Sequence, residues 1–213
     1  MEYREWAVPQ RAREALGEHA PGTLAVIGDA ALLDRRLLGL ACSVRCPGSI
    51  ILAAYDLALA LREAGVPVAG GFHSPMEREL LRLLLRGRQP VVIAVARSLA
   101  GMRVPAEWRA PIAQGRLAVV SPFGADGLRR TTAATAQARN RFVAAMAAAV
   151  LAVHAAPGGK TEALCREALA WGRPLLALAD EHNAALIGLG ARAVHAEDAG
   201  SAWAEVTTRG YPG

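Results

Sequence analysis

The chain has 213 residues, of which 53% are hydrophobic, 5% aromatic and 20% charged, and its formal net charge is +5. This length and hydrophobic content allow a buried core and exclude a wholly disordered chain. No apolar stretch reaches the about 18 residues of a membrane-spanning helix, and the charged N-terminus is unlike a signal peptide, so we expect a cytoplasmic protein with no membrane segment.

The predicted elements follow one another in a regular alternation. Residues 1–20 predict one amphipathic helix, an N-terminal extension to a single domain over residues 21–213, in which short apolar runs predict strands between helical patterns. In chain order they are strands at 23–29 and 37–43, a helix at 49–65, a strand at 66–71, a helix at 75–87, a strand at 90–96, a helix at 106–115, a strand at 116–123, a helix at 131–147, a strand at 149–155, a helix at 158–172, a strand at 173–180 and a helix at 181–190.

This alternation predicts a Rossmann-like α/β fold, with an open, mostly parallel sheet and helices on both faces. Ligands of such sheets bind at the carboxyl ends of the strands. The candidate segments therefore directly follow strands, and they are residues 43–45, 70–74, 97, 121–123 and 155–161. From the first and fourth of these segments we take Ser43, Arg45 and Ser121 as candidate ligand-binding residues.

The charge is concentrated in the middle of the chain. Residues 78–141 contain 12 arginines and three acidic residues, a net charge of +9, whereas residues 1–77 and 142–213 each have a net charge of −2. Such a block suggests an anionic partner. A solvated arginine-rich face, as a GC-rich genome would encode, explains it equally well.

Three cysteines, Cys42, Cys46 and Cys165, are too few for a disulfide framework. Cys42 and Cys46 are spaced as CxxxC, but no Cys or His pair nearby completes the four ligands of a structural zinc site. We therefore expect ordinary half-buried thiols, no metal and no cofactor.

The segment GGFHSPME follows a predicted strand and precedes a helix. Gly70 and Gly71 allow a close approach of backbone or phosphate, and Ser74 is suited to cap the helix. The free N–H groups at that helix start favour an anion, with His73 beside it. The alternative is a tight strand–helix turn with a good cap.

The segment APGGKTEA has the same character and contains Lys160, the only lysine of the chain. Gly158 and Gly159, followed by Lys160 and Thr161 in the first helical turn, predict a phosphate site. The spacing differs from that of a Walker A loop, which argues against ATP hydrolysis.

A third candidate is ARNR, early in a predicted helix. The guanidinium groups of Arg139 and Arg141, with Asn140 between them, suit bidentate phosphate contacts. A solvated helix start is the alternative.

In this order the segments resemble the Rossmann-like core of the DNA-processing protein A family, over residues 21–194. The stretch ending in CSVR is a looser form of the family's G-S-R, with Ser43 and Arg45. VPVAGGFHSPMERELL occupies the place of its S-G-x-A-x-G-I-D segment, and RLAVVSPF resembles a later strand. ARNRFVAAMAAAVLAVHA and PGGKTEALCREALAWGRPLLAL match its R-N-R helix and its small-residue loop.

The resemblance implies binding of single-stranded DNA in a basic pocket, where Arg139, Arg141 and Lys160 converge on phosphates. In the full-length family it also implies transfer of DNA to a RecA-type recombinase. We expect a protein that binds single-stranded DNA or a nucleotide phosphate without catalysis of its own, and that forms a homodimer.

Two alternatives use the same fold. PGGKTEA is also similar to the P-G-G-x-G-T-x-x-E signature of the Lonely Guy hydrolases, which cut the N-glycosidic bond of nucleoside monophosphates. Such an enzyme needs a positioned carboxylate, and Glu77 or Glu162 is available, although the acid spacing departs from the signature. The other alternative is a non-catalytic sensor of a nucleotide.

Overall fold

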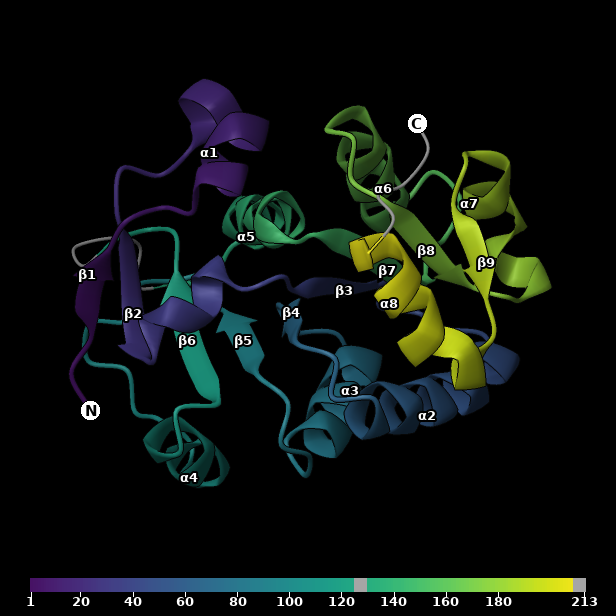
Figure 1. The fold of residues 1–213 in the computed structure, drawn as a ribbon. Coiled ribbons are helices and arrows are strands. Elements are labelled where there is room, and N and C mark those ends of the chain that lie inside the picture. The colour runs from purple at the N-terminus through teal and green to yellow at the C-terminus, as the bar shows by residue number, and fades with distance from the viewer. Residues whose placement is uncertain (125–129, 209–213) are drawn as a thin grey trace.

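The computed structural model describes residues 1–124 and 130–208, and these form a nine-stranded sheet of order β1-β2-β6-β5-β4-β3-β7-β8-β9 (Figure 1). From β6 to β9 every neighbouring pair is parallel, whereas β2 runs antiparallel to β6 and β1 antiparallel to β2. The strands are β1 (Arg4–Trp6), β2 (Leu24–Gly28), β3 (Leu38–Cys42), β4 (Val68–Gly70), β5 (Val91–Ala94), β6 (Leu117–Ser121), β7 (Ala149–His154), β8 (Leu175–Leu178) and β9 (Arg192–Val194).

Helices cover both faces of the sheet. On one face lie α2 (Gly48–Glu63), α3 (Pro75–Leu84), α4 (Ala106–Ala113) and α8 (Ala199–Thr208). On the other lie α1 (Gln10–Leu16), α5 (Ala133–Met146), α6 (Lys160–Ala170) and α7 (Ala184–Gly188). The fully buried apolar strands separate the two layers, as expected for parallel strands covered on both faces. The predicted Rossmann-like α/β fold is confirmed. None of the helices described is long and apolar enough to cross a membrane.

The strand order creates one switch point. The chain leaves β3 through α2 towards β4 on one side, and leaves β7 through α6 towards β8 on the other, while β3 and β7 are direct neighbours. In an open α/β sheet, the crevice outside the carboxyl ends of two such strands is the place where ligands bind. The fold therefore directs attention to the loops that follow β3 and β7.

The single helix predicted over residues 1–20 is wrong. Arg4–Trp6 pairs with β2 as an edge strand, and α1 begins only at Gln10. Pro9 precedes α1 as its N-cap residue; proline fixes its own backbone and disfavours a helical residue before it, so the helix starts there. Ala12 and Leu16 are buried with residues of α5.

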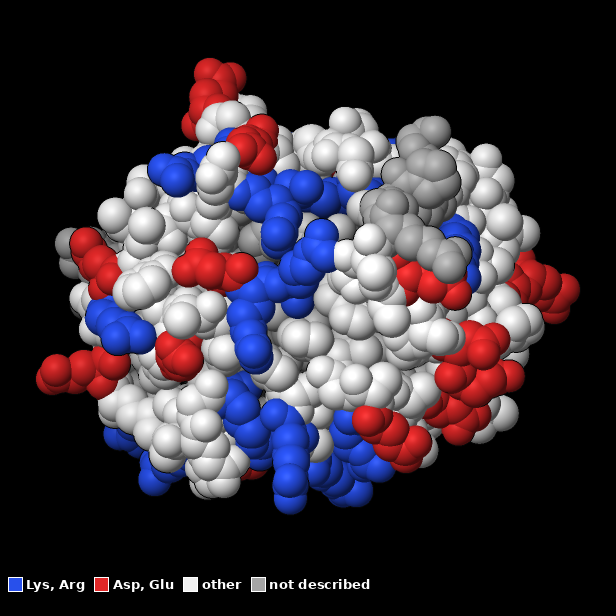
Figure 2. Space-filling model, in the orientation of Figure 1, with Lys and Arg blue, Asp and Glu red and all other residues white. Residues whose placement is uncertain are grey.

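The arginine-rich block also divides in the structure. Arg86 and Arg88 precede β5 and Arg116 precedes β6, so these three lie at the amino ends of strands, whereas Arg97 follows β5 at a carboxyl end. Figure 1 views the sheet from the amino ends, and Figure 2, in the same orientation, shows a band of Lys and Arg side chains down the middle of that face. The block is thus not one continuous binding surface.

Candidate nucleic-acid interface

Hydrogen bonds join the loops after β3 and β7 across the switch point. The backbone N–H of Ser43 donates to the carbonyl oxygen of His154 at 2.9 Å, and the Ser43 hydroxyl oxygen accepts from the N–H of Ala156 at 3.0 Å. Arg45 and Lys160 are both exposed, one in each loop region. The structure therefore presents two cations at the two sides of the crevice, and Ser43 fixes their supporting loops.

The helix start after β4 is already occupied by a carboxylate. The Glu77 carboxylate, 7% exposed, accepts from the N–H of Cys42 at 3.0 Å, of His73 at 2.8 Å and of Ser74 at 3.1 Å. The Ser74 hydroxyl in turn accepts from the N–H of Glu77 at 3.2 Å, which completes a capping box. The predicted cap is present, but the anion at these N–H groups is the protein's own Glu77.

The start of α6 also carries a carboxylate, here bonded to an N–H group just before the N-cap residue Gly159. One oxygen of the Glu162 carboxylate accepts from the N–H of Gly158 at 2.9 Å, and the other accepts from the Arg166 guanidinium at 2.6 Å. These two donors hold the pKa of Glu162 below its usual value, with the arginine as the larger cause. Gly158 has a φ of 68°, which a glycine adopts without strain and which bends the loop into the helix. Lys160 and Thr161 then lie on the open side of this turn, exposed and half-buried respectively.

Arg139 faces Gly71 from below the crevice. Only 4% exposed, its guanidinium donates to the carbonyl oxygens of Gly71 at 3.0 Å and Ala94 at 2.9 Å, and to the Asn140 side chain at 2.7 Å. Burial lowers its pKa, an effect that the nearby Glu77 opposes. A Cβ on Gly71 would lie 2.2 Å from the guanidinium carbon, so the glycine makes room for the arginine. Arg139 thus ties together the loops after β4 and β5.

Arg141 points towards α6 rather than to Gly71. Its guanidinium forms an ion pair with Glu167 at 2.6 Å and lies 5.8 Å from the centre of the Trp171 ring. Arg141 and Asn140 nevertheless line a cavity of about 110 Å³ together with Lys160. The structure therefore brings Arg141 and Lys160 together between α5 and α6, and leaves Arg139 apart from them.

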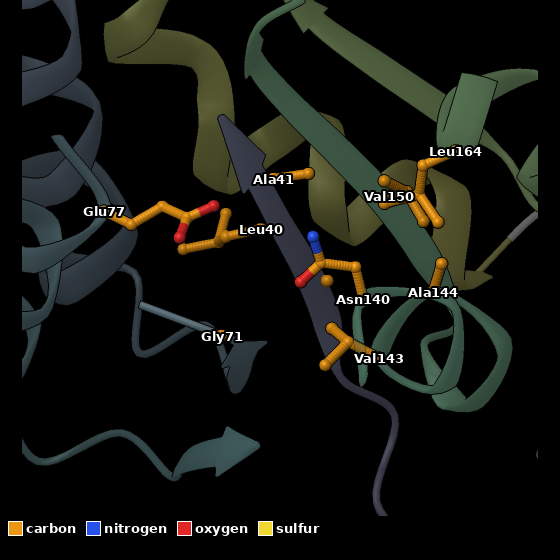
Figure 3. Close-up of a pocket in the computed structure, with 10 residues that line it drawn as sticks. Leu40, Ala41, Gly71, Glu77, Asn140, Val143, Ala144, Val150 and Leu164 are labelled. Carbon is orange, nitrogen blue, oxygen red and sulfur yellow. The ribbon is translucent and has the colours of Figure 1, made fainter. Parts of the chain in front are cut away.

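Two further features limit the depth of the site. The Ser121 hydroxyl is fully buried and donates to the carbonyl oxygen of Arg97 at 2.8 Å, so it shapes the loop and does not face a ligand. Beneath the crevice, Figure 3 shows Glu77 on one side of β3 and Asn140 with Val143 on the other, and the cavity between them measures only about 10 Å³. The interior at this point is packed and leaves no room for a ligand.

Among the described residues, no group of three or more His, Cys, Asp or Glu side chains is arranged to hold a metal ion. The thiol pair at the end of β3 is not such a group: the sulfur atoms of Cys42 and Cys46 lie 3.2 Å apart, hydrogen-bonded to each other. The carboxyl edge of the sheet therefore presents exposed cations on loops that are held by hydrogen bonds within the chain.

Comparison with known proteins identifies relatives. The family described as DNA recombination-mediator protein A matches residues 2–206. The DNA processing protein A structure from Streptococcus pneumoniae matches with a TM-score of 0.77 and 17% identity, covering 95% of this chain and 74% of that chain. The Helicobacter pylori protein, whose structure concerns its single-stranded DNA binding mode, matches with a TM-score of 0.77 and 20% identity, covering 96% and 97%.

A more distant similarity reaches another class. The molybdenum cofactor binding protein of Rippkaea orientalis matches with a TM-score of 0.57 and 14% identity, covering 82% of this chain and 98% of that chain. No curated protein sequence matches the chain. At these identities the structural similarities establish the fold alone.

Proposed function

The chain belongs to the DNA recombination-mediator protein A family, and on this premise we propose that it binds single-stranded DNA along the carboxyl edge of its sheet, in DNA processing and recombination, without catalysing a reaction. The observation on which this rests is the exposure of Arg45 and Lys160 at the two sides of the switch point. Both offer charge-assisted hydrogen bonds to phosphate oxygens.

The carboxylates at the starts of α3 and α6 favour a polymer over a small nucleotide. A terminal phosphate dianion is best held by the free N–H groups of a helix N-terminus. At the start of α3 the N–H groups of His73 and Ser74 already donate to Glu77, and before α6 the N–H of Gly158 donates to Glu162. A phosphodiester chain carries one negative charge per phosphate and needs only cations along its path, which Arg45 and Lys160 provide.

The same contacts argue against a hydrolase. A general acid or base must reach the substrate, and Glu77 is buried with three N–H groups donating to it. Glu162 is held by Gly158 and Arg166. Both candidate carboxylates serve as loop supports in this proposal.

The other predicted residues contact the DNA or hold the residues that do. His73 is exposed just after the Gly70–Gly71 turn, where its side chain can contact the bound DNA. Arg139 is a positioning residue that holds this turn, and Arg141 supports the α5–α6 side beside Lys160. A RecA-type recombinase as partner, which the sequence resemblance implies for the full-length family, and a homodimer complete the proposal.

A binding panel tests the proposal. Labelled oligo-dT, a duplex of equal length and AMP are each titrated at a low and a high salt concentration. We expect tightest binding of oligo-dT, with an affinity that falls steeply as salt rises. Preference for AMP would instead favour the nucleotide sensor, and release of free adenine from AMP that is lost in Glu77→Gln or Glu162→Gln would establish the hydrolase.

A further inference from the structure

Exposed apolar side chains are concentrated next to the proposed phosphate site. Six large hydrophobic residues of the described chain are exposed, and four of these fall within twelve residues, in the loop after β3 and the first half of α2: Val44, Ile51, Leu52 and Tyr55. Val44 is 73% exposed and Tyr55 38%. Water-facing apolar groups gathered in this way mark a binding surface more often than scattered ones do.

Three of these residues line a groove. A cavity of about 580 Å³ opens between α2 and α3, which pack side by side (Figure 1). Val44, Ile51 and Tyr55 line it from the side of α2, and Met76 lines it from α3. The groove is large enough for a flat aromatic ring to lie against the phenol of Tyr55.

Cations border the same groove. Arg78 and Arg82 of α3 line it and are both exposed, and Glu79 offsets one of them through a 2.8 Å contact with Arg82. Arg45 lies in the loop between Val44 and Cys46, two residues that line the groove. Arg45 of the proposed phosphate site is therefore a direct sequence neighbour of two residues that line the apolar groove.

We propose that the α2–α3 groove holds nucleobases of single-stranded DNA, with Tyr55 as a stacking platform, and this rests on the proposed function. Single-stranded DNA combines flat apolar faces with an anionic backbone, and proteins bind it with aromatic side chains beside basic grooves. A groove of apolar lining and arginine border complements both parts of that ligand. A second copy of this chain fits less well, because a twofold contact would bring the arginine borders of both copies towards each other.

The test compares a normal oligonucleotide with one that lacks bases. Oligo-dT and an abasic deoxyribose-phosphate oligomer of the same length are titrated into wild type, Tyr55→Ala, Tyr55→Phe and the control Leu52→Ala. Leu52 is exposed on the same helix but does not line the groove. Tyr55→Ala should weaken oligo-dT binding by about 5- to 150-fold, the range expected for loss of one stacked base.

Tyr55→Phe should keep wild-type affinity, because the phenyl ring stacks equally well, and Leu52→Ala should be neutral. The abasic oligomer should bind wild type and Tyr55→Ala alike. The dependence of log affinity on log salt should not change in Tyr55→Ala, because no phosphate contact is lost. This separates base stacking from a general disturbance of the basic site.

Three results would overturn parts of this scheme. Unchanged oligo-dT binding by Tyr55→Ala, while Arg45→Ala weakens it, rejects the groove and keeps the proposed function. A lower molar mass of Tyr55→Ala by light scattering, with DNA binding intact, makes the groove an interface between copies. Failure of wild type to bind oligo-dT at all rejects the proposed function and the groove with it.

Discussion

Replacing Arg45 and Lys160 by alanine, singly and together, is the most direct perturbation of the proposed interface. Both side chains are exposed, and neither forms an ion pair with a residue of 1–124 or 130–208. A charge-assisted hydrogen bond contributes about 1.5–3 kcal/mol, and solvent exposure favours the lower end of this range. About 1.4 kcal/mol corresponds to tenfold in Kd, so each single variant should bind roughly tenfold more weakly.

The double variant should lose about a hundredfold if the two contacts are independent. Each lost phosphate contact should also reduce the slope of log affinity against log salt by about 0.7, the value for single strands. Fluorescence anisotropy of labelled oligo-dT at several salt concentrations measures both quantities. The slope is informative because a merely misfolded variant would lose affinity without a defined change of slope.

Two controls frame this experiment. Arg88→Ala removes an exposed arginine before β5, at the opposite edge of the sheet, and should leave affinity and slope unchanged. Arg141→Ala removes a guanidinium already paired with Glu167 and should change the slope less than Lys160→Ala does. A folded double variant with wild-type affinity and slope would refute the reasoning and move the phosphate contacts elsewhere.

Three further predictions follow from contacts around the site. Gly71→Ala should displace the Arg139 guanidinium and leave buried donors unpaired, which costs roughly 2 kcal/mol and lowers the midpoint of thermal unfolding by about 4–8 °C in a chain of this size. Because the folded-state pKa of Glu162 is lowered from 4.5, its ionisation stabilises the fold fully above that value and less as the pH falls; Glu162→Gln should therefore flatten the acid side of a plot of unfolding temperature against pH. A hydrogen bond from the neighbouring thiol lowers the pKa of Cys46, whereas burial raises that of Cys165 to about 12, so a thiol-specific reagent followed by absorbance should react first with a group that Cys46→Ser removes.

The sheet could be predicted because its strands are buried on both faces. β3, β5, β6 and β7 are apolar at almost every position, which distinguishes them from the helical patterns between them. Alternation with helices then implies parallel strands and a common carboxyl edge. The antiparallel strand β1 escaped prediction because three residues, two of them charged, give no recognisable period.

The hydrogen-bond partners of the carboxylate at the start of α3 could not be predicted, because they include residues far away in the sequence. Ser74 and Glu77 have the spacing of a capping box, but the bond from Cys42 to Glu77 spans 35 residues and requires β3 and α3 to be neighbours. Arg139 was predicted at a phosphate because the closely spaced guanidinium groups of ARNR suit bidentate phosphate contacts. Its burial follows from the absence of a side chain at Gly71, a property of the folded turn.

The engagement of the cations at the two ends of the strands explains why the carboxyl edge is the better candidate for binding. At the amino ends of the strands, Arg11 and Arg173 donate to carbonyl oxygens in the last turn of α5, and Arg116 donates to the carbonyl oxygen of Leu85 just after α3. Helix C-termini carry partial negative charge, and these arginines neutralise it. These three arginines therefore stabilise the fold.

At the carboxyl ends of the strands, acidic side chains rather than arginines interact with the helix ends. Helix N-termini carry partial positive charge, and Glu77 and Glu162 satisfy it from within the chain. Arg45 and Lys160 then remain as full charges with no ion-pair partner among the described residues. Salt-dependent affinity for DNA comes from cations that displace counterions from phosphates. In this proposal, cations at this edge that have no ion-pair partner in the described part of the chain, such as Arg45 and Lys160, count for more than arginines that already bind carbonyl oxygens.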